Sequence, residues 1–493
     1  MRARVSEKTT VAVVFTAAVF MSALDTTIVN VALPTIGRDF AVAPIAVDGI
    51  SVAYLVSLAL FMPVSGYLGD RFGGKRVLLT ATVIFTVASA LCGVATSLGE
   101  LVAFRALQGV GGGMMTPVGM AMLFRAFPPG ERLRASAVLV MPTTLGPASG
   151  PVLGGLLVSE LSWRWVFWVN IPIGIAAVAF GAIFLRHRAE AGPGRFDLTG
   201  FLLSGAGLGL LMYGISEGPN VGWASPAIVA GIVVGAILLA LTVLVEYRAA
   251  EPILAVRLLG DRLFRSGTVA NILMTSGFIG TLFVMSLYLQ DGRGLGALAA
   301  GLSIFPEAVG VAVGSQLASR VLYPRLGPRR HMAGGLTGIA TSIGLMALLG
   351  AHSSLWWARL LMFAMGFGMA QVMLTTQTAS FATVSPEATG RASTMFNAGR
   401  QLGAATGVAL LTTAIGIVGA THHVSGHLVA NLDAYRAAFL VAAAFCLAGV
   451  PFALLISDAD AAATIPARRR PRRDRLGAPA PGQPAPLPRP SDP

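Results

Sequence analysis

Charged residues are scarce in this sequence. Asp, Glu, Lys and Arg make up 12% of its 493 residues, whereas soluble proteins carry about 25%. The mean hydropathy is +0.75, and apolar runs recur that are long enough to cross a bilayer, which takes about 20 residues. These runs do not alternate between apolar and polar residues, as the strands of a transmembrane barrel would. The sequence therefore excludes a soluble protein and predicts an all-α polytopic membrane protein.

Cysteine is scarce as well. The two cysteines, Cys92 and Cys446, both fall within predicted spans, so the sequence indicates neither a disulfide framework nor a zinc site. The basic, polar amino terminus is followed by an apolar run without a small-residue cleavage site, which favours an uncleaved first helix over a signal peptide. No segment outside the spans is long enough to fold as a domain of its own.

Fourteen transmembrane spans are predicted from the apolar runs. They cover residues 11–33, 49–68, 77–96, 100–122, 135–158, 166–185, 199–217, 226–246, 266–289, 297–318, 331–350, 355–377, 392–417 and 436–457. If the chain starts inside, both termini and the even-numbered gaps lie on one side, and that side holds most of the 35 Lys and Arg residues. This positive-inside asymmetry predicts cytoplasmic termini in the plasma membrane. The net charge of +13 therefore reflects topology, and we expect no nucleic-acid partner.

Two sequence correspondences indicate an internal duplication. The gaps after spans 2 and 10 read DRFGGKR and PRLGPRR, with Gly73 and Gly327 aligned. Those after spans 4 and 12 read FPPGERLRAS and VSPEATGRAS, with Arg134 and Arg391 aligned at nearly the same offset. Repetition at a fixed offset is the mark of duplicated units. Two six-helix halves around a central cavity are an architecture of secondary transporters.

The expected domains follow from this duplication. An N-terminal six-helix half covers residues 1–198, two inserted helices cover 199–246, and a C-terminal six-helix half covers 247–458. The tail, residues 459–493, is basic and then rich in proline, a composition that predicts disorder. Its basic segment would be attracted to anionic lipid, although a tail that merely fixes topology is the alternative.

The gap between spans 2 and 3 reads GYLGDRFGGKR. Its glycines permit a tight turn, and Asp70 can pair with cationic side chains or with a helix amino terminus at the cytoplasmic face. Such a cluster can latch a cytoplasmic gate, and the alternative is a plain topogenic turn. Pro324 stands in the place of Asp70 in the second copy, so the latch should be one-sided. The expected gate residues are Gly66, Asp70, Arg71, Gly73, Lys75 and Arg76.

Spans 4 and 5 carry two further patterns. Arg105 and Gln108 share one face of span 4. An arginine so deep costs at least about 2.5–3.5 kcal/mol if it faces lipid, so it should face the interior. In span 5, Gly146, Gly150 and Gly154 recur every fourth residue and form a flat stripe that allows close helix packing.

Together these motifs resemble the major facilitator superfamily, and within it the fourteen-helix drug:proton antiporter family. The resemblance rests on the 66–76 loop, LDTTIVNVALP at 24–34, RALQGVGGG at 105–113, GPASGPVLGG at 146–155 and GRASTMFNAGRQLG at 390–403. It implies that Arg105 takes part in proton coupling, with bonds to the carbonyls of the first helix as the structural alternative. It also implies an exporter motif made of Gly146, Gly150, Pro151, Gly154 and Gly155. Ala137 departs from the glycine that this family usually has there.

Asp25 lies inside the first apolar run. An isolated ionised carboxylate in a dry site is so costly that it takes up a proton, and water or a cation reverses this. We therefore expect Asp25 to face a cavity and to couple protons, together with Arg105. Glu307 in span 10 is a candidate second proton or cation site, with a paired structural carboxylate as the alternative.

Other polar residues within the spans are candidates for a substrate cavity: Ser22, Gln108, Gln371, Gln377, Asn397 and Gln401. His422, His423 and His427 lie in one gap without carboxylate support, so we expect no metal site there.

The sequence predicts a monomeric secondary transporter that exports an amphipathic, cationic drug or toxic compound in exchange for protons, with no cofactor. Export of an endogenous metabolite, such as a self-made antibiotic, a siderophore or a lipid-linked product, is the closest alternative. An uptake symporter or uniporter disagrees with the span-5 motif. An intramembrane enzyme is not expected, because no paired carboxylates, metal ligands or nucleophile arrangement lie within the spans.

Overall fold

The computed structural model describes residues 6–42, 44–127, 131–186, 196–248, 254–419, 421–424, 427–461 and 464. The first half comprises α1 (Glu7–Asp39), α2 (Pro44–Phe61), α3 (Val64–Phe72), α4 (Gly74–Val94), α5 (Leu98–Ala126), α6 (Arg132–Glu160), α7 (Trp165–Trp168) and α8 (Asn170–Phe184). The insertion forms α9 (Leu198–Val221) and α10 (Pro226–Arg248).

The second half has the same helical character. It comprises η2 (Val256–Gly260), α11 (Arg262–Leu287), η3 (Tyr288–Gly292), α12 (Ala297–Ile304), α13 (Pro306–Leu317), η4 (Ala318–Leu322), α14 (Tyr323–Met346), α15 (Leu355–Ala379), α16 (Thr389–Val418), β1 (Thr421–Val424), β2 (His427–Ala430) and α17 (Leu432–Leu454). The two strands pair antiparallel and form a small hairpin in the gap where the sequence predicts only a loop. The side chains of His422, His423 and His427 lie outside the described part of the chain.

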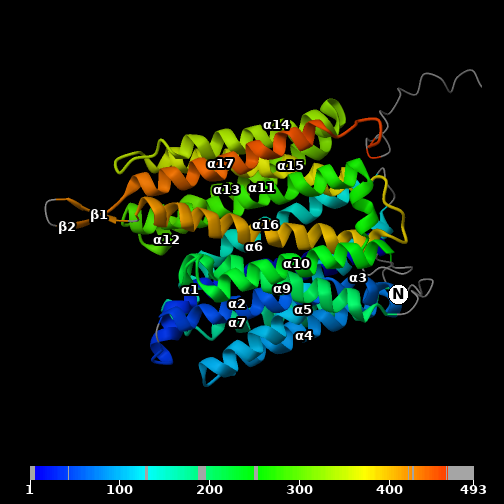
Figure 1. Cartoon of the computed structure of the whole chain (residues 1–493), viewed down its shortest axis with the longest axis horizontal. Coiled ribbons are helices and arrows are strands. Elements are labelled where there is room, and N and C mark those ends of the chain that lie inside the picture. Colours follow the sequence, from blue (N-terminus) through cyan, green and yellow to red (C-terminus); the bar gives the residue numbers. More distant parts are fainter. Residues whose placement is uncertain are drawn as a thin grey trace, which may run out of the picture.

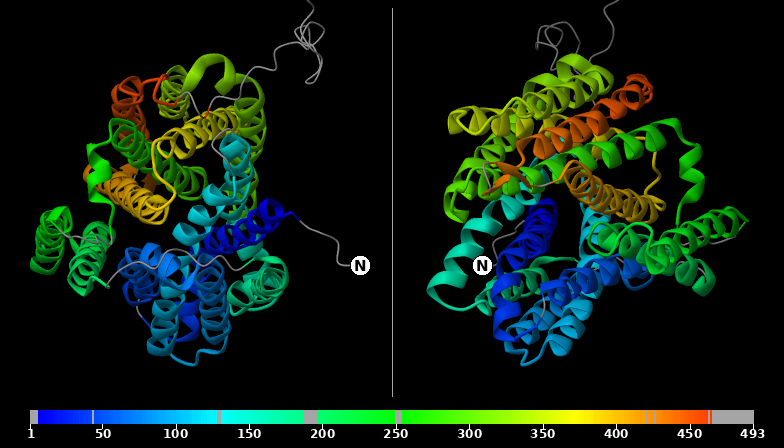
Figure 2. Two further views of the ribbon diagram at one scale, coloured as in Figure 1. Left: turned by 90° about the vertical axis from the view of Figure 1, so that its right-hand side faces the viewer. Right: turned by 60° about the vertical axis from the view of Figure 1, so that its left-hand side comes forward.

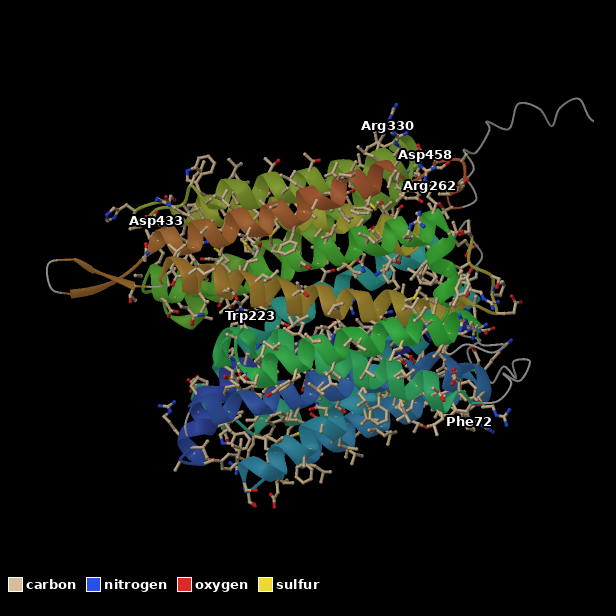
Figure 3. All side chains as sticks on the ribbon, viewed as in Figure 1. Phe72, Trp223, Arg262, Arg330, Asp433 and Asp458 are labelled. Carbon is tan, nitrogen blue, oxygen red and sulfur yellow. The ribbon has the colours of Figure 1, made fainter. Side chains whose placement is uncertain are left out.

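The helices run side by side along the long axis of the molecule, in two bundles (Figures 1 and 2). The bundle of α1–α8 lies on one side and the bundle of α11–α17 on the other. We call the end with Phe72, Arg262, Arg330 and Asp458 the basic end, and the end with Asp433 and the β1–β2 hairpin the hairpin end (Figure 3).

The number of spans is only partly supported. Among the described residues, ten helices are long and apolar enough to cross a membrane, or eleven if the pair α2 and α3, bent by 55°, is one span. Residues 298–346, where the sequence predicts two spans, count as one because helix runs on through a kink at Gly327. α5 and α6 have 29 residues each, which is longer than the roughly 20 that a bilayer requires. Fourteen spans therefore remain a prediction.

The two aligned glycines adopt a similar backbone. Gly73 has φ 85° and ψ 134°, and Gly327 has φ 73° and ψ 162°. Only glycine adopts this region readily. Asp458 lies where a side chain on Gly327 would point, and its carboxylate accepts a 2.9 Å hydrogen bond from the backbone N–H of Arg329. A residue that follows α17 thus interacts with the turn of the second half.

The two halves meet at the basic end. One hydrophobic cluster includes Phe124 of α5 together with Phe381 and Phe396 from the second half. The rings of Phe124 and Phe381 lie 4.8 Å apart, and the hydroxyls of Ser65 and Thr394 lie 3.0 Å apart. Such packing is as tight as that within a domain core. In this structure the halves are therefore in direct contact at their basic ends.

The inserted helix α9 touches both halves (Figure 2). Its Leu208 and Met212 form a small cluster with Ala59 of α2, and Leu402 of α16 packs against that cluster. Near its hairpin end, Trp223 Nε1 donates a 2.8 Å hydrogen bond to Thr413 Oγ1 of α16 (Figure 3). The insertion therefore lies beside the line where the halves meet.

Candidate functional site

Asp25 is buried inside the first half, with 0% of its surface exposed. Its Oδ2 accepts a 2.6 Å hydrogen bond from Arg105 Nη1. Its Oδ1 accepts bonds of 2.9 Å from Gln108 Nε2 and of 3.2 Å from Asn170 Nδ2. Every one of these bonds is accepted by the carboxylate, and one comes from a cation, so the geometry suits an ionised aspartate.

Arg105 lies in the protein interior, as its insertion cost predicts, with 1% of its surface exposed. Its Nη1 also donates to Gln108 Oε1 at 2.6 Å, and its Nε donates to the carbonyl of Ile50 at 3.4 Å. Its guanidinium carbon lies 4.3 Å from the centre of the Tyr54 ring, which adds a cation–π contact. The expected alternative bond to a helix carbonyl thus exists, but to α2 and in addition to the bond to Asp25.

The placement of Asp25 differs from the expected one. The sequence predicts that Asp25 faces a cavity, yet in this structure it lies within a closed polar network. The reason is that α5 and α8 supply donors that water or a ligand would otherwise supply. Arg105 occupies the position expected for a cationic ligand. Asn170 and Ser89 complete the network, since Asn170 Nδ2 lies 3.1 Å from Ser89 Oγ, which donates to the Phe167 carbonyl at 2.8 Å.

The glycine stripe of α6 packs on the same part of α1. A side chain on Gly146 would meet Ala23 and the backbone nitrogen of Leu24. One on Gly150 would meet Thr27, and one on Gly154 would meet Ile28.

These contacts flank Asp25, so α6 contacts the turns of α1 that carry the carboxylate. Gly155 is different, because no atom of the described residues lies within 4 Å of an added side chain. The side chain of Pro151 is outside the described part.

At the basic end, Asp70 forms an ion pair with Arg125 of α5, with 2.8 Å between Oδ1 and Nη2. Arg125 Nε also donates to the carbonyl of Pro386 at 3.3 Å, so the pair reaches the second half. A side chain on Gly66 or on Gly390 would be in tight contact, on Gly390 with Asp70 itself. The loop where the sequence predicts a gate thus contacts the second half through Asp70 and Arg125.

The remaining gate residues take other places. Lys75 Nζ donates to the carbonyls of Ala182 and Leu185, at 2.9 and 2.6 Å, and so binds the C-terminal end of α8, where cations are favoured. Arg71 and Arg76 are exposed. In the neighbouring loop of the second half, the pKa of the Glu387 carboxyl lies below its usual value, first because of its own backbone N–H, then the Ser385 hydroxyl and Arg125.

A cavity lies between the halves. Pro147 of α6 forms one part of its lining, and residues of α11, α13, α15 and α16 form the rest, including Asn271, Glu307 and Arg400. Its volume is about 40 Å³, above the roughly 10–15 Å³ that a cavity needs to hold a water molecule. A drug-sized ligand occupies roughly 300 Å³ or more. This site therefore has to widen before it can hold such a ligand.

Glu307 reaches the cavity because the helix breaks beside it. Phe305 separates α12 from α13, and Pro306 starts α13, a position that proline favours. Glu307 follows in the first turn, where the helix dipole favours a negative charge. It is 1% exposed, and its Oε1 has no hydrogen-bond partner among the described residues.

The residues predicted for a substrate cavity lie elsewhere. None of the six, Ser22, Gln108, Gln371, Gln377, Asn397 and Gln401, lines the cavity of Glu307. Ser22 lies 3.2 Å from the Tyr54 hydroxyl, and Gln108 belongs to the Asp25 network. Gln371 Oε1 lies 2.6 Å from His331 Nε2. Asn397 donates to the carbonyl of Ser393 at 2.8 Å.

Sequence reasoning missed Asn170 and Asn271. Both are amides inside apolar runs, and a polar side chain in such a run was the signal that could have identified them. Helical spacing alone cannot tell which of several buried amides lines a cavity and which bonds a neighbouring helix, because the answer depends on partners from distant segments.

Comparisons with known proteins show the family of this chain. The family model for the Major Facilitator Superfamily matches residues 15–408. The chain is 32% identical over 396 residues to a "Multidrug resistance protein B homolog" of Mycobacterium tuberculosis, a match that covers 80% of this chain and 73% of that protein.

The chain is also 33% identical over 394 residues to the "Tetracenomycin C resistance and export protein" of Streptomyces glaucescens, with the same shares of each chain. Among solved structures, the human organic anion transporter MFSD10 superposes with a TM-score of 0.65 at 16% identity, over 90% of this chain and 99% of that one. At this identity the likeness concerns the fold alone.

Proposed function

Because the chain belongs to the major facilitator superfamily, we propose that it exports amphipathic compounds in exchange for protons by alternating access. It is a multi-pass membrane transporter and not an enzyme, because its family and its relatives are transporters. The relatives named for multidrug resistance and for antibiotic export support the direction of transport.

The observation that carries the proposal is the buried pair of Asp25 and Arg105, with Nη1 and Oδ2 2.6 Å apart. A proton and Arg105 compete for the same carboxylate. When Asp25 takes up a proton, Arg105 loses its counter-ion and has to find other acceptors, since a buried charge without a partner is costly. This change acts on α1 and α5 together.

The movement of α1 passes to the cavity through α6. Gly146 and Gly150 contact α1 beside Asp25, and Pro147, between them, lines the cavity of Glu307. A change in the packing of α1 therefore alters one wall of the cavity. Glu307 is the second coupling residue in this proposal, because its carboxylate lies in the cavity itself.

The driving force is adequate. One pH unit supplies about 1.4 kcal/mol per proton, and a membrane potential of 100 mV adds about 2.3 kcal/mol for each charge moved. Together they would sustain an accumulation of roughly two to three orders of magnitude per proton, at about 1.4 kcal/mol for each factor of ten.

The orientation follows from charge. We place the basic end, and both termini, in the cytoplasm, since arginine is concentrated there. The structure then corresponds to a conformation closed to the cytoplasm, with the pair of Asp70 and Arg125 as its latch. Export would require the latch to open, so that a compound reaches the cavity from inside.

The finer features of the proposal are fourteen spans, a monomer, and contact of the basic tail with anionic lipid. The tail beyond residue 464 lies outside the described residues. Export of an endogenous metabolite is the second candidate, which the relative named for tetracenomycin C favours. A positively charged substrate was expected because its charge would pair with an accessible Asp25. In this structure Arg105 already forms that pair.

Transport in inverted membrane vesicles tests the proposal. A fluorescent amphipathic dye should accumulate in vesicles that contain the protein when their interior is made acidic. Collapse of the gradient with a protonophore should release it, and vesicles without the protein are the control. Accumulation that is indifferent to the proton gradient would refute proton exchange.

A further inference from the structure

The cavity between the halves contains polar groups that have no partner. Both the Oδ1 and the Nδ2 atoms of Asn271 are buried without a hydrogen bond in the described part of the chain, and so is Glu307 Oε1. Asn271 and Glu307 are each 1% exposed, and both line this cavity. Buried polar atoms without partners are costly, so native proteins keep few of them unless something bonds them in another state.

Arg400 adds a positive charge to the same cavity. It lies on α16, and among the residues that the structure describes no acidic side chain forms an ion pair with it. A guanidinium can only donate hydrogen bonds, whereas an ionised carboxylate can only accept them. The cavity thus offers donors from Arg400 and Asn271 together with acceptors from Glu307 and Asn271.

The rest of the lining is apolar. Met274, Phe278, Met369 and Met373 form much of the wall. Methionine side chains are flexible and polarisable, so they adapt to ligands of different shape. The wall therefore suits an apolar body whose polar groups reach Asn271, Glu307 and Arg400.

We propose that this cavity binds an amphipathic ligand of zero net charge, neutral or zwitterionic, which presents both a hydrogen-bond donor and an acceptor. The donor binds Glu307 and Asn271 Oδ1, and the acceptor binds Arg400 and Asn271 Nδ2. When Glu307 is ionised, its negative charge offsets the positive charge of Arg400. A ligand of zero net charge keeps the net charge of the cavity at zero. A permanent cation adds a second positive charge beside Arg400 in a site with little water, which is unfavourable.

The inference rests on the proposed function, because it names the substrate class of the exporter. It also explains how a proton competes with an uncharged ligand. A proton on Glu307 removes its negative charge and turns one of its oxygens into a donor, so the donor group of the ligand loses its charged acceptor and keeps only neutral ones. Proton binding and ligand binding at this carboxylate therefore oppose one another.

Equilibrium dialysis of the purified full-length chain tests the inference with two probes of opposite character. Ciprofloxacin is a zwitterion at neutral pH, and tetraphenylphosphonium is a permanent cation of similar apolar size. Wild-type protein should bind ciprofloxacin at least about tenfold more tightly, since a hydrogen bond to a charged group contributes a factor of roughly ten to a hundred. This comparison needs no variant.

Two substitutions assign the preference to the cavity. Arg400→Gln should weaken ciprofloxacin binding about tenfold and strengthen tetraphenylphosphonium binding. Asn271→Leu removes both unpartnered amide atoms and should weaken ciprofloxacin binding alone. Arg436→Gln is the matched control, because Arg436 is exposed and pairs with Asp433 at the hairpin end, so both affinities should stay unchanged.

Tighter binding of tetraphenylphosphonium by wild-type protein would overturn the inference, and so would an unchanged preference in Arg400→Gln protein that elutes as a single species. These outcomes are separate from the test of proton exchange. Proton-driven accumulation of tetraphenylphosphonium without ciprofloxacin binding would reject the ligand class and retain the exporter. Ciprofloxacin binding without any gradient-driven transport would do the reverse.

Discussion

Arg105 Nη1 lies 2.6 Å from Asp25 Oδ2, and the two side chains are 1% and 0% exposed. This is a buried ion pair within one half of the transporter, away from the cavity between the halves. Its attraction is offset by the cost of removing both charges from water. Such a pair stabilises the fold little in net terms, but it responds strongly to the loss or gain of one charge.

Asp25→Asn should abolish gradient-driven export while the protein still reaches the membrane. The amide keeps the shape and one acceptor, so Gln108 retains a partner, but Arg105 loses its counter-ion. We expect a loss of stability of about 3 kcal/mol and dye accumulation near the level of empty inverted vesicles. Full proton-coupled accumulation by this variant would remove Asp25 from the mechanism and leave Glu307 as the coupling residue.

The double variant Asp25→Asn with Arg105→Gln separates stability from coupling. Replacing both charges removes the unpaired arginine, so the thermal unfolding temperature should recover towards that of the wild type. Transport should stay uncoupled, because no carboxylate remains in the network. Proton release on substrate addition, measured with a pH dye in weakly buffered detergent solution, should fall in the double variant. Wild-type proton release there would contradict the role of the pair.

Gly150→Ala should impair transport, whereas Gly155→Ala should not. A methyl group at position 150 would overlap Thr27 and approach the backbone nitrogen of Ile28 to 3.0 Å, whereas at position 155 no atom in the described part of the chain lies within 4 Å. Overpacking of this kind costs about 1–3 kcal/mol and would push α6 away from α1. The two variants carry the same substitution in one motif, so equal transport rates would show that close packing of α6 on α1 is not required.

Asp70→Asn should open the basic end. It removes the 2.8 Å ion pair with Arg125. The loss of a contact that only the closed conformation makes should shift the equilibrium towards the open conformation by about 1–3 kcal/mol. The readout is maleimide labelling of a cysteine placed at Thr394, which lies at the contact between the halves. The native Cys92 and Cys446 are both buried, so background labelling should be low.

Labelling of the Thr394 cysteine should increase several-fold in the Asp70→Asn background. Arg436→Gln breaks an exposed ion pair at the opposite end and should leave labelling unchanged. Equal labelling in all backgrounds would mean that Asp70 does not latch the gate.

Much of the architecture could be predicted from the sequence because bilayer physics acts on local composition. Apolar runs and the distribution of arginine each depend on short segments, and they predicted an all-helical membrane protein. The relation between two halves, indicated by the aligned glycines at 73 and 327, stays a prediction. The stripe on α6 could be found for the same reason, because its glycines recur every fourth residue and close backbone packing requires glycine there.

The partners of the polar groups could only come from the tertiary structure. Asp25 and Arg105 are 80 residues apart along the chain, and Asn170 joins them from α8, so the spacing on α1 could not show that the carboxylate is closed off from the cavity. Likewise, Glu307, Asn271 and Arg400 come from three helices and converge only when α11, α13 and α16 pack. The sequence determined that buried charges exist in this protein. The packing decided which of them neutralise each other and which remain available to a ligand, because electrostatic energy depends on distances that the order of residues does not contain.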